Sequence, residues 1–200
     1  MTKTPSERFN TCRKLVHDDA FEAQLAAEMA TPLISGALTK MKDHYLTGVF
    51  LRRVLTRYLG LVLSRLLDKP ENGRTGVTAS IASLLEMAED EGILSSTQIQ
   101  SFISEFEKIK VHAGAEYDLV RALRDLRNIQ LAHKLIPWSN PADDVLGHHL
   151  IEFAGAIFNF AMTLDQALAE ATSISLSDSC KAAKDFQSNV DIFYKGLTSG

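Results

Sequence analysis

Apolar residues recur at alternating spacings of three and four along most of this chain, a pattern typical of amphipathic helices. No stretch alternates between apolar and polar residues with a period of two, so the sequence predicts no strand. We therefore expect an all-α fold, a multi-helix bundle of six to eight helices, with Asp18-Asp19 as a candidate break in the first segment. The expected helices cover residues 6–30, 42–68, 78–89, 97–111, 117–136, 141–170 and 178–195.

Capping residues mark the expected ends of these helices. A hydroxyl or amide oxygen at an N-cap accepts a hydrogen bond from a free backbone N–H of the first turn, and a glycine after the last turn adopts the left-handed conformation that closes a helix. Pro141, at a first helical position, strengthens the start signal before it. The expected N-caps are Ser6, Ser95 or Ser96, and Asn140, and the expected glycine stops are Gly92 and Gly196.

Segment 42–68 is apolar around most of its circumference, as expected of a helix surrounded by others. We therefore place it in the middle of the bundle. Its arginines interrupt the apolar surface, so a membrane span is not predicted. Two further segments contribute inward-facing residues, namely Ile99, Phe102, Ile103 and Phe106 in one, and Leu146, Leu150 or His149, Phe153, Ile157, Phe160, Leu164 and Leu168 in the other.

Composition restricts the class of protein. The chain has 200 residues, 46% of them apolar, which suits a single helical domain over 1–200. Its net charge of −4 argues against a broad basic surface that coats nucleic acid. Cys12 and Cys180 are too far apart for metal-ligand spacing, so we expect no disulfide framework, no metal and no cofactor. No signal-peptide-like stretch stands near the start, and the sequence favours a cytoplasmic protein without a membrane partner.

Segment 117–136 carries the candidate chemistry. Its apolar stripe runs from Leu119 through Leu123 to a position in line with the stripe that is occupied by His133. Arginines recur every three residues beside the stripe, and a proline at 137 places His133 in the last turn, where the helix dipole favours a protonated imidazole. The flanking arginines are Arg121, Arg124 and Arg127.

The residues RNIQLAHKL at 127–135 resemble the R-polar-x4-6-H signature of the HEPN superfamily. The stretch YLGLVLSRLLDKPENGRTGVTASIASLLEMAE at 58–89 is similar to the abortive-infection branch of that superfamily. The resemblance covers about 42–168 and implies a HEPN-like core there. Helices 6–30 and 178–195 would then be extensions.

This resemblance implies a metal-independent endoribonuclease of toxin or phage-defence type. His133 would act as base or acid, Arg127 would bind phosphate oxygens, and Asn128 would orient the phosphate or a ribose hydroxyl. One chain offers one such histidine, whereas the reaction uses two proton-transfer groups, so a composite site at a homodimer interface is expected. We expect no nucleotidyltransferase partner within residues 1–200, so an antitoxin or regulatory protein would be a separate chain.

Several alternatives remain open from the residues alone. His133 is either catalytic or a structural histidine on a packed stripe. Arg124 and Lys134 contact RNA, or they belong to a solvated flank and a helix end. The whole protein is a ribonuclease, or a non-catalytic HEPN-type module that binds a partner protein or a nucleotide. Asp144, His148 and Glu152 share one helix face, which suits intrahelical pairs better than a metal site.

Overall fold

The computed structural model describes residues 4–41, 43–68, 79–113, 119–123, 142–175 and 179–198. All regular structure in these ranges is helical, which confirms the predicted all-α bundle. A short helical stretch covers 119–123. The elements are α1 (Glu7–Ile34), η1 (Ala37–Lys40), α2 (Tyr45–Leu66), α3 (Ile81–Asp90), α4 (Ser96–Ala113), α6 (Ala142–Thr172) and α7 (Ser179–Thr198).

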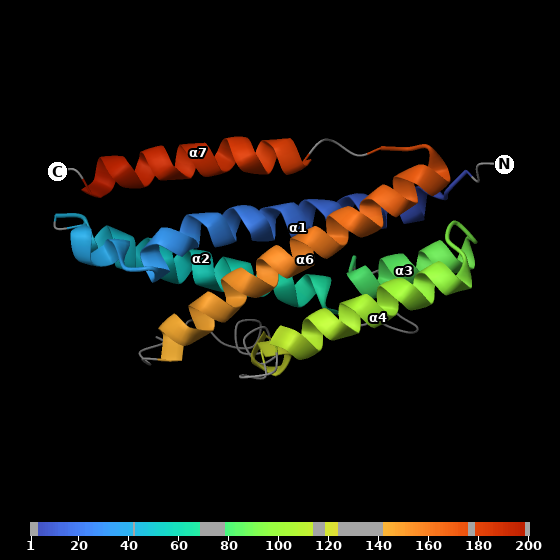
Figure 1. The fold of residues 1–200 in the computed structure, drawn as a ribbon, viewed down its shortest axis with the longest axis horizontal. Helices are drawn as coiled ribbons and strands as arrows, with labels where there is room; N and C mark the ends of the chain where they lie inside the picture. The colour runs from blue at the N-terminus through green and yellow to red at the C-terminus, as the bar shows by residue number, and fades with distance from the viewer. Residues whose placement is uncertain are drawn as a thin grey trace.

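Helix α1 contacts most of the other elements. It packs along α2 and α6 and also contacts α3, α7 and η1, so it runs through the middle of the bundle (Figure 1). Its buried side is rich in alanine, and side chains that small let neighbouring helix backbones approach closely. The sequence had suggested 6–30 as an extension of the core, whereas α1 supplies part of the core itself. The buried alanines of α1 are Ala20, Ala23, Ala26, Ala27 and Ala30.

The boundaries of α1 follow from its end residues. Ser6 is the N-cap as predicted, and its hydroxyl accepts a 3.1 Å hydrogen bond from the N–H of Phe9. The helix passes through Asp18-Asp19 without a break. Pro32 lies inside its last turn, where the loss of one N–H removes a single hydrogen bond, and the helix therefore continues past residue 30.

The caps of α3 and α4 confirm the predicted turn chemistry. Gly92 has φ 59°, and the N–H of Ile93 donates to the carbonyl of Ala88 at 2.8 Å, which closes α3 in the manner expected of a glycine stop. Ser95 and Gln98 cap α4 reciprocally, because Gln98 Oε1 accepts from the backbone N–H of Ser95 at 3.0 Å and Ser95 Oγ accepts from the N–H of Gln98 at 3.4 Å.

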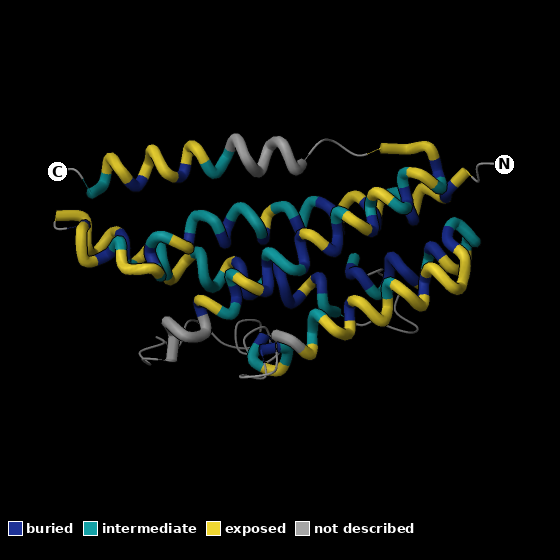
Figure 2. Tube along the Cα trace, in the orientation of Figure 1, coloured by how far each residue is buried: buried dark blue, intermediate teal, exposed yellow. Residues whose placement is uncertain are grey.

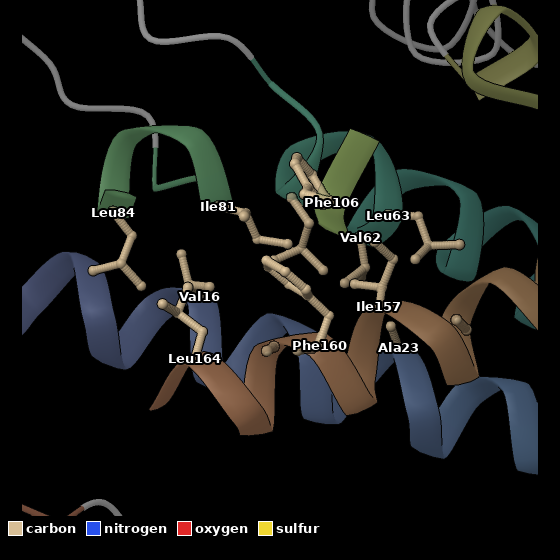
Figure 3. Packing of buried hydrophobic residues seen from close by; sticks show 14 of the residues in the cluster. Val16, Ala23, Val62, Leu63, Ile81, Leu84, Phe106, Ile157, Phe160 and Leu164 are labelled. Atoms are coloured by element: carbon tan, nitrogen blue, oxygen red, sulfur yellow. The ribbon is translucent and has the colours of Figure 1, made fainter. Parts of the chain in front are cut away.

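The main core lies between α1, α2, α3, α4 and α6 (Figure 3). Phe160 of α6 sits near its centre, stacked on Phe106 of α4 with ring centroids 5.3 Å apart. The prediction for the 97–111 segment was wrong at one position, because Ile103 is exposed. The predicted apolar seam of α6 is confirmed at every described position, and its buried residues are Leu150, Phe153, Ile157, Phe160, Leu164 and Leu168.

Helix α2 differs from its predicted place in the middle of the bundle. The buried large apolar side chains of α2 all lie in its second half, at Leu59, Val62, Leu63 and Leu66. The first half exposes large apolar side chains, and Figure 2 shows the tube of α2 changing from largely exposed to largely buried along its length. The prediction failed because, within the described ranges, neighbouring helices pack against one side of this first half and leave the other side exposed.

A smaller cluster, called here the second cluster, holds the first half of α2 from behind. It consists of buried Leu33, Leu38, Met41, Val190 and Tyr194, with Val49, Leu51 and Leu55 of α2 packed against it. Gly48 makes the close approach possible, since a Cβ at this position would lie 2.5 Å from Leu38 Cδ2.

Helix α7 extends beyond its predicted stop. Gly196 lies inside the helix, which ends at Thr198, so the predicted glycine stop was wrong. Leu197 follows the glycine and packs against the second cluster, and this contact keeps the last residues helical. The Tyr194 hydroxyl also donates a 2.7 Å hydrogen bond to the carbonyl of Met29, which ties this end of α7 to α1.

Candidate functional site

The motif residues lie outside the described residues. This applies to Arg127, Asn128 and His133, and equally to the two weaker RNA-binding candidates, Arg124 and Lys134. Their mutual geometry and the expected composite site therefore stay predictions. The predicted helix start at Asn140 and Pro141 also falls outside the described ranges, and α6 is described from Ala142 onward.

The structure does describe the turn that leads into the motif. Residues 119–123 are helical, with Leu119 fully buried and Leu123 nearly so, and both belong to the main core. Arg121, between them, is exposed. Within 119–123 the structure agrees with the predicted apolar stripe at Leu119 and Leu123 and with the predicted basic flank at Arg121.

The histidines of α6 lie on its surface side. His148 and Glu152, one turn apart, are exposed, and His149 is half-buried. The side chain of Asp144 is outside the described set. Among the described residues, no three histidine, cysteine, aspartate or glutamate side chains gather as ligands for a metal ion. The one-turn spacing of His148 and Glu152 permits the intrahelical pairing that the sequence analysis favoured.

Cys12 is a buried thiol facing the main core. Burial raises its pKa to about 11, although a backbone hydrogen bond at Ser80 acts in the opposite direction. The thiol is therefore neutral at physiological pH. Because the thiolate is the reactive form, Cys12 is an apolar core residue in chemical terms and not a nucleophile.

Arg13 is a buried charge that the sequence pattern did not single out. Its Nε donates to Asp165 Oδ1 at 2.6 Å, and its Nη2 donates to the carbonyl of Asp165 at 3.1 Å. Its Nη1 donates to the carbonyl of Ile174 at 2.9 Å and lies 3.5 Å from the Thr172 hydroxyl. Every nitrogen of the guanidinium makes at least one hydrogen bond and the side chain is only 2% exposed, so Arg13 joins α1 to the end of α6 as a structural contact.

Two polar contacts link the surfaces of α1 and α2. Arg65 Nη2 donates to Asp19 Oδ1 at 2.7 Å, and the Tyr58 hydroxyl donates to the carboxylate of Glu22. Burial raises the pKa of Asp19, and the positive charge of Arg65 opposes that change. Burial also raises the pKa of Tyr58 to about 12, reinforced by the hydrogen bond to Glu22. These contacts fix two carboxylates along the edge of α2.

Two buried acceptors stand between α1 and α6. Gln24 Nε2 donates to Glu28 Oε1 at 2.7 Å, but Gln24 Oε1 and Glu28 Oε2 are buried without a partner. Gly155 of α6 faces this pair, because a Cβ there would lie 3.9 Å from Gln24 Oε1. Buried acceptors normally have a hydrogen-bond donor. This pair is therefore expected to lower the stability of the contact around it.

Comparison with family models, curated proteins and solved structures found no match to this chain. The resemblance to the HEPN superfamily therefore rests on the motif residues themselves. In the part of the chain that the structure describes, no helix combines the length and apolar character needed to cross a bilayer.

Proposed function

We propose that this protein is a metal-independent endoribonuclease of HEPN type, acting in the cytoplasm as a toxin or phage-defence effector. The observation that carries the proposal is the spacing of Arg127, Asn128 and His133 ahead of a proline stop. Two structural facts support it: the fold is an all-α bundle, and the turn 119–123 inserts its leucines into the core as the stripe required.

The chemistry assigned to these residues is transfer of the phosphate ester to the neighbouring 2′-oxygen. One His133 removes the proton from the 2′-hydroxyl, and the 2′-oxygen then attacks phosphorus. Arg127 stabilises the negative charge that develops on the phosphorane oxygens. The bond to the 5′-oxygen breaks, and the His133 of a second protomer gives that oxygen a proton. The products are a 2′,3′-cyclic phosphate and a 5′-hydroxyl.

The partners follow from this reaction. RNA is the substrate, with Arg124 and Lys134 as additional phosphate contacts, and a second copy of the chain completes the site. An antitoxin or a regulatory protein supplied as a separate chain would hold the activity in check. The rival function is a non-catalytic module of the same type that binds a partner protein or a nucleotide.

The decisive experiment is a cleavage assay on single-stranded RNA in the presence of EDTA. Arg127→Ala and His133→Ala should each lower the rate by about 10²-fold or more, and Asn128→Ala should lower it less, because a neutral amide contributes a weaker hydrogen bond. His148→Ala, at an exposed histidine on α6, is the matched control and should leave the rate unchanged.

Two results would reject the mechanism: cleavage that persists in both the Arg127 and the His133 variants, or cleavage that requires added Mg²⁺. Absence of cleavage by a folded dimer would favour the binding module instead. Each variant should keep the thermal melt of the parent protein, since the proposed roles are chemical.

A further inference from the structure

Apolar burial in this protein is divided between two clusters. The main core lies between α1, α2, α3, α4 and α6, whereas the second cluster joins the end of α1, η1, the first half of α2 and α7. Among the described residues, the two clusters share no member. Stability is not uniform across a structure, and regions that share no core side chains can lose their packing separately.

Helix α7 holds a large share of the second cluster. Val190 and Tyr194 are two of its buried members, and Phe186 and Leu197 pack against it from the same face of the helix. The Tyr194 hydroxyl donates to the carbonyl of Met29 at 2.7 Å. Figure 1 shows α7 along the outside of the bundle, where it packs mainly on α1 and η1. One apolar face therefore attaches this helix to the rest of the protein.

The first half of α2 draws its described apolar packing from the second cluster. Val49, Leu51 and Leu55 pack on that cluster, whereas Leu46 on the outer side is 81% exposed. In the described part of the chain, the N-cap residue His44 makes no capping hydrogen bond through its side chain. A helical stretch shorter than about 12–15 residues is marginal in water without tertiary packing. Order in this half of α2 therefore depends on the second cluster.

The end of α1 and η1 depend on the same cluster. Leu33 of α1, Leu38 of η1 and Met41 are buried in it. Pro32 lacks the N–H that a helix interior would use, so hydrogen bonds contribute less to this end of α1. Leu38 and Met41 lie directly against Gly48 of α2, since a Cβ there would be 2.5 Å from Leu38 Cδ2. Removing α7 would take a packing partner from all three elements at once.

The end of α6 is held by contacts outside the second cluster. Arg13 donates from Nε to Asp165 Oδ1 at 2.6 Å and from Nη1 to the carbonyl of Ile174 at 2.9 Å. Cys12 and Val16, on either side of Arg13 in α1, belong to the main core. The chain as far as Ile174 can therefore keep its place when α7 leaves.

We propose that α7 is a latch, meaning a helix whose release frees other elements. When α7 undocks, η1, the last turns of α1 and the first half of α2 lose their order together, while the main core stays folded. A ligand that binds only the closed or only the open state would shift the balance between them. The latch is independent of the proposed ribonuclease activity, because its residues are those of the second cluster and not the motif at 127–133.

Hydrogen–deuterium exchange of the full chain, read by mass spectrometry, tests the latch. Val190→Asp places a carboxylate in the second cluster and should speed exchange in α7 and in 37–55 roughly tenfold or more. Peptides from α3 and from 150–168 of α6 should keep the parent rate. Ile192→Asp adds the same charge to the same helix at a side chain that is 68% exposed, so this matched control should exchange like the parent protein.

Two milder variants keep the test valid if Val190→Asp does not fold. Tyr194→Phe removes the hydrogen bond to Met29 and should speed exchange by about two- to tenfold, by the same factor in α7 and in 37–55. Gly48→Ala perturbs the cluster from the opposite side, through Leu38 and Met41. It should speed exchange in α7, because the parts of one cooperative unit open together.

Three results would overturn the latch. The first is faster exchange in α7 with the parent rate retained in 37–55, since α7 would then leave without freeing α2. The second is an equal increase in α3 and in 150–168, which would make the whole bundle one cooperative unit. The third is an α7 that exchanges at the parent rate in both Val190→Asp and Tyr194→Phe. Loss of RNA cleavage in a motif variant with normal exchange would concern the ribonuclease alone.

Discussion

The two halves of α2 have similar composition and opposite environments. In the second half Leu63 is completely buried, whereas Leu46 in the first half is 81% exposed. Both are leucines on the same helix with arginines nearby. The difference arises because the second half of α2 lies in the main core, whereas, among the described residues, the first half packs on the second cluster. The apolar content of a helix therefore indicates that it will be covered, but the neighbouring elements decide where.

Truncating one leucine in each half should show the largest difference. Leu63→Ala leaves a cavity in the main core and should lower the free energy of unfolding by about 2–5 kcal/mol. Leu46→Ala removes an exposed side chain and should change it by no more than about 0.5 kcal/mol. Urea denaturation at a low protein concentration measures both without a contribution from association. Equal losses in the two variants would mean that the halves are equally buried.

Alkaline pH should weaken the second cluster through Tyr194. Burial raises the pKa of Tyr194 to about 12, above the usual value of 10.0. The neutral phenol is thus favoured in the folded state. Its contribution to the free energy of unfolding is complete below pH 10 and is lost as the pH rises through 12. The two-unit difference corresponds to about 2–3 kcal/mol.

The measurement is denaturation as a function of pH. Tyr194→Phe is the control, because this variant cannot ionise at that position and should lose less stability between pH 10 and 12 than the parent protein does. Identical pH profiles for the two proteins would contradict the assignment of this loss to Tyr194.

Adding a methyl group behind the first half of α2 should have a smaller effect. Gly48→Ala forces Leu38 and Met41 to move, since the new Cβ would lie 2.5 Å from Leu38 Cδ2 and 2.9 Å from Met41 Sδ. Overpacking, which costs about 1–3 kcal/mol, is expected to outweigh the gain of about 1 kcal/mol in helix propensity. Gly155→Ala is the matched control, because its nearest contact would be at 3.9 Å. Thermal melts should place Gly48→Ala below the parent and Gly155→Ala at or above it.

The smallest effect is expected at the surface ion pair between Arg65 of α2 and Asp19 of α1. Arg65→Ala removes the 2.7 Å bond to Asp19, but Arg65 is 51% exposed and solvent screens the pair. A loss of less than about 1 kcal/mol is expected, and it should shrink further at high salt. A loss comparable to that of Leu63→Ala would show that this edge of α2 is far less solvated than its exposure indicates.

The regular elements could be predicted from the sequence where the signal was local and periodic. The seam of α6 and the caps at Ser6, Gly92 and Ser95 depend on neighbouring residues, so a single chain segment contains the whole pattern. The central position of α1 could not be predicted this way, because its buried face consists largely of alanine, which is a weak hydrophobic signal. The sequence showed that α2 is apolar around most of its circumference, but not which part of it other helices cover.

Around the candidate site, too, local patterns could be predicted and long-range pairs could not. The stripe at Leu119 and Leu123 followed from spacing alone, and the structure confirms it. Arg13 was missed because a charged residue in a sequence is ordinarily assigned to the surface, and its partner Asp165 is separated from it by 152 positions. Only the folded chain brings such a pair together. The roles of Arg127, Asn128 and His133 rest on sequence and await the cleavage assay.

The hydrogen bonds between Arg13 and the end of α6 also bear on the order in which this chain folds during synthesis. Asp165 leaves the ribosome 152 residues after Arg13, so α1 emerges long before α6 is there to receive it. Helix α1 can pack on η1, α2 and α3 before that, but the guanidinium of Arg13 and the side of α1 that faces α6 stay solvated. The contacts between α1 and α6 are thus among the last to form. A nascent chain halted between α4 and α6 should expose α1 to chaperones and proteases.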